Sequence, residues 1–314
     1  MLAFLAGCAW MPFIGGDDED DEEFETTEHI LYESAQSSLR SGNYRAGVEK
    51  LQRLEARFPF GRYAEQAQLE LIYAHYMGAS YDEAEAAAER FVRLHPQHRD
   101  VDYALYLRGL VAFSEGRGLF DRFRPSDISK RDMTNIRRSF VIFTELLREH
   151  PDSDYALDAR QRTVYLRNVI AEAEVNVANY YISRGAYVAA ANRARTVVEN
   201  YSQTPAVAEA LAILVEANYR LGLDEAANDA LRILAINHPR YPAFDDEGNF
   251  VLAETIRNRD RSWLNIMTLG LLDRPDVPPP IQIDHPEGFV PPEAVDEEEQ
   301  PSGKPWWRRI LSLG

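Results

Sequence analysis

The chain has 314 residues, enough for a large core or several stacked repeats, and a formal net charge of −17. Its one cysteine, Cys8, excludes an intrachain disulfide, and no stretch reaches the roughly 20 apolar residues that a membrane-spanning helix needs. Residues 17–25 hold eight acids and residues 273–314 carry a net −5, while no basic stripe is evident, so nucleic acid is disfavoured as a partner.

The N-terminus carries a short apolar segment that ends at Cys8. Its last four residues, Leu5-Ala6-Gly7-Cys8, resemble the lipobox of bacterial lipoproteins, in which the cysteine becomes the acylated N-terminus. Only seven residues precede Cys8 and none is basic, so the signal looks truncated, and an incidental cysteine is the alternative. We assign residues 1–8 to this signal and residues 9–26 to an acidic tether, which cannot bury enough apolar surface to order itself.

Residues 27–272 are predicted to form an all-α tetratricopeptide-repeat solenoid of five helix pairs plus a C-terminal covering helix. Apolar periodicity and turn residues place the pairs at residues 28–40 and 44–57, 62–77 and 82–95, 101–115 and 133–149, 154–184 and 187–200, and 205–221 and 224–237. Residues 250–271 look like the covering helix, because the last repeat of a solenoid needs a cap.

The second helices share one register, counted back from a closing dipeptide such as His95-Pro96. Small residues stand at the first position: Gly47, Ala84, Ser139, Ala190 and Ala227. Two further positions hold Leu51, Ala88, Phe143, Ala194 and Leu231, then Leu54, Phe91, Leu146, Val197 and Leu234. A small residue lets two helices approach closely and the apolar residues fill the contact, which is the tetratricopeptide pattern. Ser202 replaces the usual closing proline in the fourth repeat.

Two segments interrupt or follow the repeats. An insertion at residues 116–132 mixes Leu119, Phe120 and Phe123 with arginines, so it is either a contact site or a segment that packs back on its own helix pair. Residues 273–314 are rich in proline and acids, which predicts a disordered tail. The tail ends in Trp306-Trp307-Arg308-Arg309, a sequence suited to a membrane interface or a partner groove, or a frayed end without a role.

Motifs for catalysis, cofactors and metals do not appear in the sequence. There is no Gly-rich phosphate loop, His-Glu-x-x-His, Cys-x-x-Cys or Gly-x-Ser-x-Gly pattern. The closing position of a repeat is occupied by His95, His150 and His238. A structural role in the turn is a simpler interpretation of these histidines than metal binding. We therefore predict no enzyme activity, no catalytic residue, no metal and no cofactor.

The five repeats, the lipobox and the interrupted third repeat together resemble the BamD family, the lipoprotein subunit of the outer-membrane β-barrel assembly machine of Gram-negative bacteria. The match is strongest over residues 184–193, from Arg184 through Asn192 to Arg193. The resemblance implies a non-catalytic scaffold, lipid-anchored through Cys8 at the periplasmic face of the outer membrane. Its implied partners are BamA, accessory Bam lipoproteins and unfolded outer-membrane β-barrel proteins.

Two sets of site residues follow from this resemblance. Arg193, with Asn192 and Arg184, would face BamA, although a surface arginine in a local helix pair is the alternative. The N-terminal repeats would receive the substrate peptide, for which we assign Tyr44, Tyr63, Tyr73, Tyr76, Arg40 and Arg62. Most of these tyrosines would serve equally well as core residues. A periplasmic repeat lipoprotein that scaffolds cell-wall or envelope machinery, without BamA, is the alternative function.

Overall fold

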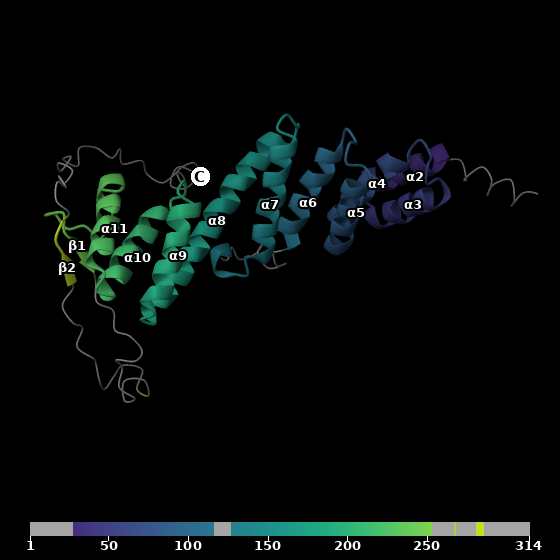
Figure 1. The fold of residues 1–314 in the computed structure, drawn as a ribbon. Helices are drawn as coiled ribbons and strands as arrows, with labels where there is room; N and C mark the ends of the chain where they lie inside the picture. Colours follow the sequence, from purple (N-terminus) through teal and green to yellow (C-terminus); the bar gives the residue numbers. More distant parts are fainter. Residues whose placement is uncertain (1–27, 116–126, 253–266, 268–280, 286–314) are drawn as a thin grey trace, which may run out of the picture. The chain divides into compact units, whose positions relative to one another are not determined.

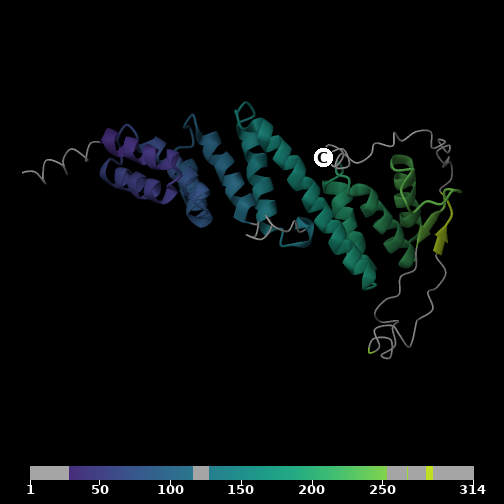
Figure 2. The same cartoon turned by 180° about the vertical axis from the view of Figure 1, so that it is seen from behind.

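The computed structural model describes residues 28–115, 127–252, 267 and 281–285. Cys8 and the expected acidic tether lie outside these residues. The chain divides into two compact units, Met1–Leu166 and Arg167–Gly314, and each contains buried apolar clusters of its own. Figures 1 and 2 show their helices in chain order from opposite sides.

The first unit is built from antiparallel helix pairs. Its elements are α2 (Glu28–Arg40), α3 (Tyr44–Arg57), α4 (Ala64–Met77), α5 (Tyr81–Leu94), α6 (Val101–Glu115), the short 3-10 helix η2 (Ile128–Lys130), α7 (Thr134–Glu149) and the first part of α8 (Ala156–Ser183). Each helix from α2 to α6 packs on the next one along the chain, and α4 also touches α6 (Figure 1). This is the predicted repeat architecture.

Helix α4 shows why this stacking suits the sequence. Its Ala67 and Leu71 enter the cluster made with α2 and α3, while Leu69 and Ile72 enter a second cluster with α5 and α6. A helix that is apolar on several faces needs neighbours on each of them, and the following repeat supplies the second neighbour. Both clusters therefore depend on adjacent repeats, not on one helix pair alone.

The predicted register of the second helices is confirmed. The small residues Gly47, Ala84, Ser139, Ala190 and Ala227 are all buried, as are the ten apolar residues at the two following positions. At Gly47 a Cβ would stand 2.4 Å from Leu39 Cδ2, so only glycine fits without a shift of that side chain. Ser139 Oγ donates to the Gly109 carbonyl at 2.9 Å, which satisfies this buried hydroxyl.

Tight turns join the helices within three of the pairs through glycine at one equivalent position. Gly42, Gly185 and Gly222 have φ of 76°, 70° and 72°, and each stands two residues before a second helix. Ala79 occupies the same place before α5 with φ of 57°, a left-handed conformation that an L side chain adopts at a cost. The second repeat therefore uses the common turn without its preferred residue.

The second unit contains the rest of α8, then α9 (Tyr187–Asn200), α10 (Val207–Arg220) and α11 (Asp224–Asn237). Its core is rich in alanine, including Ala171, Ala190, Ala194 and Ala210. Two short antiparallel strands follow, β1 (Phe250–Leu252) and β2 (Ile281–Ile283), with Val251 opposite Gln282. The long α8 agrees with the single helix predicted over residues 154–184.

The prediction of a covering helix over residues 250–271 is wrong at its start, because residues 250–252 form the strand β1. Phe250 and Leu252 are buried and Val251 is only partly covered, so burial alternates with the period of a strand. Phe250 also packs its ring edge-on against Phe244, 5.8 Å between centroids. The rest of that predicted helix lies outside the described residues, apart from residue 267, which is helical.

The prediction of a disordered tail over residues 273–314 is also wrong for three residues, because residues 281–283 form the strand β2. Ile281 and Ile283 pack against the core of the second unit. Most of the predicted insertion, residues 116–126, lies outside the described residues. Its last part contains η2, whose first turn is capped by Asp127 accepting from the Ser129 N–H at 3.1 Å.

Candidate protein-binding surfaces

The six predicted substrate residues form two groups at opposite ends of α4. Tyr63 and Arg62 precede its first turn, whereas Tyr73 and Tyr76 lie near its end, about 15–20 Å away at the usual helical rise. Tyr44 joins the second group, with its ring edge-on to Tyr73 at 6.2 Å. The structure therefore divides the predicted set into two groups of residues.

The group at the start of α4 is a stack of rings. Tyr63 stacks on Tyr32 with centroids 4.4 Å apart, and the Arg62 guanidinium lies 5.7 Å from the Tyr63 centroid. The Tyr63 N–H donates to Glu28 Oε1 at 2.7 Å, which fixes the backbone at this corner. Tyr63 is only half-buried, so it supports the fold and still presents part of its ring.

The group at the end of α4 is partly core and partly surface. Tyr73 and Tyr76 pack against the cluster formed by α4, α5 and α6, yet neither is buried. Burial, followed by the neighbouring Tyr44, raises the pKa of Tyr73. Arg40, at the last residue of α2, is exposed. Tyr73 and Tyr76 are therefore partly covered by the core and partly exposed, and their role in binding stays a prediction.

Further tyrosines that the sequence prediction missed extend this surface onto α6 and the turn before α8. Tyr103 lies 5.4 Å from Tyr155, and Tyr155 stacks on Tyr106 at 4.8 Å. Burial raises the pKa of Tyr103, and the nearby Tyr155, Tyr73 and Glu70 raise it further. We call Tyr32, Tyr73, Tyr103, Tyr106 and Tyr155 the tyrosine row. The signal available in sequence was the spacing of Tyr103 and Tyr106, one turn apart on α6.

Carboxylates hold the hydroxyls of this row. Tyr32 Oη donates to Glu70 Oε1 at 2.6 Å, and Tyr106 Oη donates to Asp158 Oδ2 at 2.7 Å. Burial and the bond to Asp158 raise the pKa of Tyr106 to about 12. Beside Asp158 a pocket of about 270 Å³ is lined by Phe113, Phe143, Asp158, Gln161, Arg162, Tyr165 and Leu166. Aromatic walls with fixed polar groups are typical of peptide-binding surfaces.

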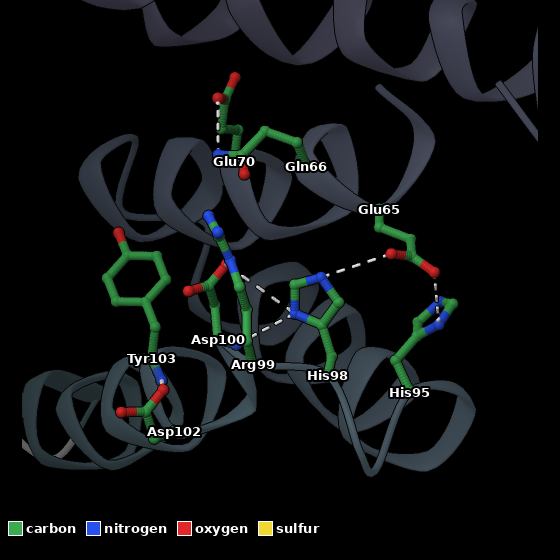
Figure 3. Close-up of polar contacts among 9 residues, drawn as sticks. All are labelled: Glu65, Gln66, Glu70, His95, His98, Arg99, Asp100, Asp102 and Tyr103. Atoms are coloured by element: carbon green, nitrogen blue, oxygen red, sulfur yellow. Dashed lines mark hydrogen bonds and ion pairs between the residues drawn. The ribbon is translucent and has the colours of Figure 1, made fainter. Parts of the chain in front are cut away.

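The turns that close the repeats have structural histidines. His95, His150 and His238 cap the C-termini of α5, α7 and α11, each donating its backbone N–H to a carbonyl of the last turn. Figure 3 shows Glu65 of α4 beside His95 and His98, with carboxylate oxygens 3.4 Å from His95 Nδ1 and from His98 Nε2. In the described residues no group of His, Cys, Asp and Glu has the arrangement of a metal site.

The second surface, in the second unit, contains the predicted partner residues. Arg193 Nη1 binds Glu174 Oε2 at 2.9 Å, and the side chains are 48% and 6% exposed. The Arg193 guanidinium is therefore already bound to a buried carboxylate of its own chain, and only about half of the Arg193 side chain is exposed. Asn192 is exposed on α9, and exposed Arg184 lies with its guanidinium 5.2 Å from the Tyr180 centroid. Asn192 and Arg193 thus lie on α9, and Arg184 lies in the turn that joins α8 to α9.

None of the helices within the described ranges is long and apolar enough to cross a membrane.

Comparison with known proteins gives a consistent assignment. Residues 24–233 match a family described as "Outer membrane lipoprotein" (YfiO). Outer membrane protein assembly factor BamD of Neisseria meningitidis serogroup A is 42% identical over 238 residues, 76% of this chain and 88% of that protein. The factor of the same name from Vibrio cholerae is 36% identical over 236 residues, 75% of this chain and 95% of that protein.

Proposed function

Because the chain belongs to the BamD family of outer membrane protein assembly factors, we propose that it is a non-catalytic scaffold of the β-barrel assembly complex, with substrate and BamA on different units. The first unit would receive unfolded outer-membrane β-barrel proteins. The second would hold BamA, with accessory Bam lipoproteins alongside. Acylation of Cys8 would anchor the protein at the periplasmic face of the outer membrane.

The observation that carries the substrate site is the tyrosine row. Half-buried tyrosines offer flat apolar faces and hydroxyls with little loss of side-chain entropy on binding, which suits peptides of varied sequence. Tyr76 lies on α4 with Tyr73, Tyr44 packs edge-on against Tyr73, and Tyr63 stacks on Tyr32, so these three tyrosines extend the row at its edges. Arg62 is exposed beside the Tyr63 ring and Arg40 is exposed at the end of α2, and both would meet acidic groups of the substrate, including a terminal carboxylate.

For BamA, the proposal rests on the exposed half of Arg193. One of its nitrogens is occupied by Glu174, and the guanidinium has further donors for a carboxylate on the partner. Glu174 would orient the side chain, and Asn192 and Arg184 would contribute polar contacts at the edge. A charge pair of this kind adds specificity as well as affinity.

Site-specific photo-crosslinking in intact envelopes tests both halves at once. A photoreactive residue at Tyr73 should capture unfolded barrel substrate, and one at Asn192 should capture BamA. A probe at Arg45, which is 92% exposed on α3, is the matched surface control and should capture neither. If the Tyr73 and Asn192 probes capture the same partner, the division between the units is wrong. Capture of cell-wall proteins at both positions, with no BamA, would favour the envelope scaffold.

A further inference from the structure

The turn between α3 and α4 carries a phenylalanine that the fold leaves in solvent. Phe60 is 99% exposed, whereas Phe58 packs against the core of the first repeat. The backbone on the other side is held close to α2, because a Cβ at Gly61 would stand 2.2 Å from Glu28 Oε1. Phe60 therefore stands on a turn that is fixed at both sides.

Arginines without carboxylate partners accompany this phenylalanine. Arg53 and Arg57 are exposed and lie one turn apart on α3, and in the described part of the chain neither forms an ion pair. By contrast, Arg90 of the next repeat binds Glu55 at 2.7 Å. Residues 53–62 contain three arginines against one carboxylate, although the whole chain has a net charge of −17.

The equivalent turn of the second repeat repeats the pattern and lies next to the first. Leu94 is 56% exposed beside exposed Arg93, and residues 90–100 again hold three arginines against one carboxylate. Glu65, in the first turn of α4, connects the two turns through its contacts with His95 and His98 (Figure 3). In this second turn Arg90 binds Glu55 and Arg99 binds Asp100, which leaves Arg93 as its arginine without an ion pair in the described part of the chain. Two neighbouring turns thus each present an exposed apolar side chain with at least one unpaired arginine.

We propose that Phe60, Leu94, Arg53, Arg57 and Arg93 form a docking surface for an anionic phospholipid bilayer. Planar guanidinium groups bind phosphate by paired hydrogen bonds, and an aromatic side chain on a fixed turn inserts at the depth of the headgroups. An outer membrane assembly factor works at such a surface. A fully solvated phenylalanine between unpaired cations suits a deformable bilayer better than an acidic protein surface, which would need a matching pocket for the ring. This surface acts in addition to acylation of Cys8 and is separate from the tyrosine row.

Vesicle co-sedimentation tests this surface with the full-length chain carrying Cys8→Ser, so that no acyl chain contributes. Binding to vesicles of phosphatidylcholine with phosphatidylglycerol should exceed binding to phosphatidylcholine alone and should fall with added salt. Arg57→Glu should lower the partition coefficient at least about fivefold, the effect of roughly one basic residue near an anionic surface. Phe60→Ser should weaken binding at both low and high salt. Arg45→Glu makes the same charge change at the other end of α3 and should stay within about twofold of the parent protein.

Equal binding to both vesicle types, no binding to either, or equal losses for Arg57→Glu and Arg45→Glu would each overturn the proposal. Unchanged binding in Phe60→Ser and Arg57→Glu would overturn it as well, since the attachment would then lie elsewhere in the chain. Circular dichroism confirms that each variant is folded. Crosslinking of substrate from Tyr73, measured in detergent without vesicles, should be normal in Arg57→Glu. Loss of vesicle binding is thereby separated from failure of the proposed substrate site.

Discussion

Phe143 in the first unit and Ala194 in the second occupy the same register position, and the difference between them extends to their surroundings. Phe143 is fully buried against Gly109, where a Cβ would stand 2.6 Å from the ring. Ala194 is fully buried in a cluster that contains many other alanines. At this position a ring fills the space between α6 and α7 in the first unit, whereas a small residue lets the helices approach closely in the second.

The same contrast marks the two candidate surfaces. The first unit presents a row of half-buried tyrosines that suits varied peptides. The second presents one well-defined ion pair between Arg193 and Glu174, which suits a fixed partner. One repeat pattern therefore produces two kinds of surface, because the pattern fixes only the contact positions and leaves the rest of each helix open.

The largest expected effect breaks the contrast in the core. Phe143→Ala should destabilise the first unit by about 3–5 kcal/mol, since the ring fills the space beside Gly109, which has no side chain of its own. The matched change Ala194→Gly in the second unit should cost only about 1 kcal/mol, mostly through helix propensity. Thermal melts followed by circular dichroism measure both. Equal losses of stability in the two variants would mean that packing at this position does not differ between the two units.

The next effect tests the register that the two units share. Ala84→Trp should destabilise the protein by roughly 1–3 kcal/mol, because Ala84 is fully buried where two helices meet. Arg45→Trp, at a position with a 92% exposed side chain, is the control and should change the melting temperature little. A melting temperature unchanged in both variants would contradict the close packing at this position.

The register was predictable because it repeats, so each copy supports the others. The helix ends followed from turn residues such as Gly42, Gly185 and Gly222. The strand at Phe250–Leu252 was missed because a run of three apolar residues is too short to show whether its periodicity is that of a helix or of a strand. At the candidate substrate surface, the sequence singled out Tyr73 but not Tyr103, Tyr106 or Tyr155, which the structure places near it. Contacts between residues far apart in sequence, such as Tyr106 with Tyr155 and Arg193 with Glu174, depend on how the helices stack.

A third prediction concerns the ion pair between Arg193 and Glu174, which distinguishes the candidate surface of the second unit from the tyrosine row of the first. Arg193→Met should cost about 1–2 kcal/mol, because Glu174 would keep its buried charge without this partner, while the half-exposed arginine limits the loss. The double variant Arg193→Met with Glu174→Gln should recover much of that stability. Chemical denaturation of both variants provides the comparison. If the single variant is as stable as the parent, the ion pair has no structural role.

Alkaline pH should affect the first unit through its tyrosine row. The pKa of Tyr106 is raised to about 12 in the folded state, above its ordinary value near 10. The folded state therefore favours the neutral hydroxyl, and this contribution is complete below pH 10 and is lost as the pH rises through about 12. Denaturation between pH 9 and 12 should show a decline of about 1–2 kcal/mol that Tyr106→Phe reduces. A decline of the same size in Tyr106→Phe would assign it to other groups.

The smallest effect concerns the one turn that departs from the common residue. Ala79→Gly should stabilise the second repeat by about 1 kcal/mol, because glycine adopts a φ of 57° without the Cβ clash. Gly222→Ala, at the equivalent turn of the second unit, should destabilise by a similar amount. Melting temperatures that move in the same direction for these two changes would contradict the shared turn geometry.

The central claim is that the two units hold different partners, and a paired pull-down from envelopes tests it most directly. The Tyr73→Leu variant, which keeps apolar bulk but removes the ring, should retain BamA and lose unfolded barrel substrate. The Arg193→Glu variant should lose BamA and retain substrate, with its circular dichroism spectrum checked because the change places a second carboxylate beside Glu174. This opposite pattern is the predicted result. Loss of both partners in each folded variant, or of neither, would contradict the account.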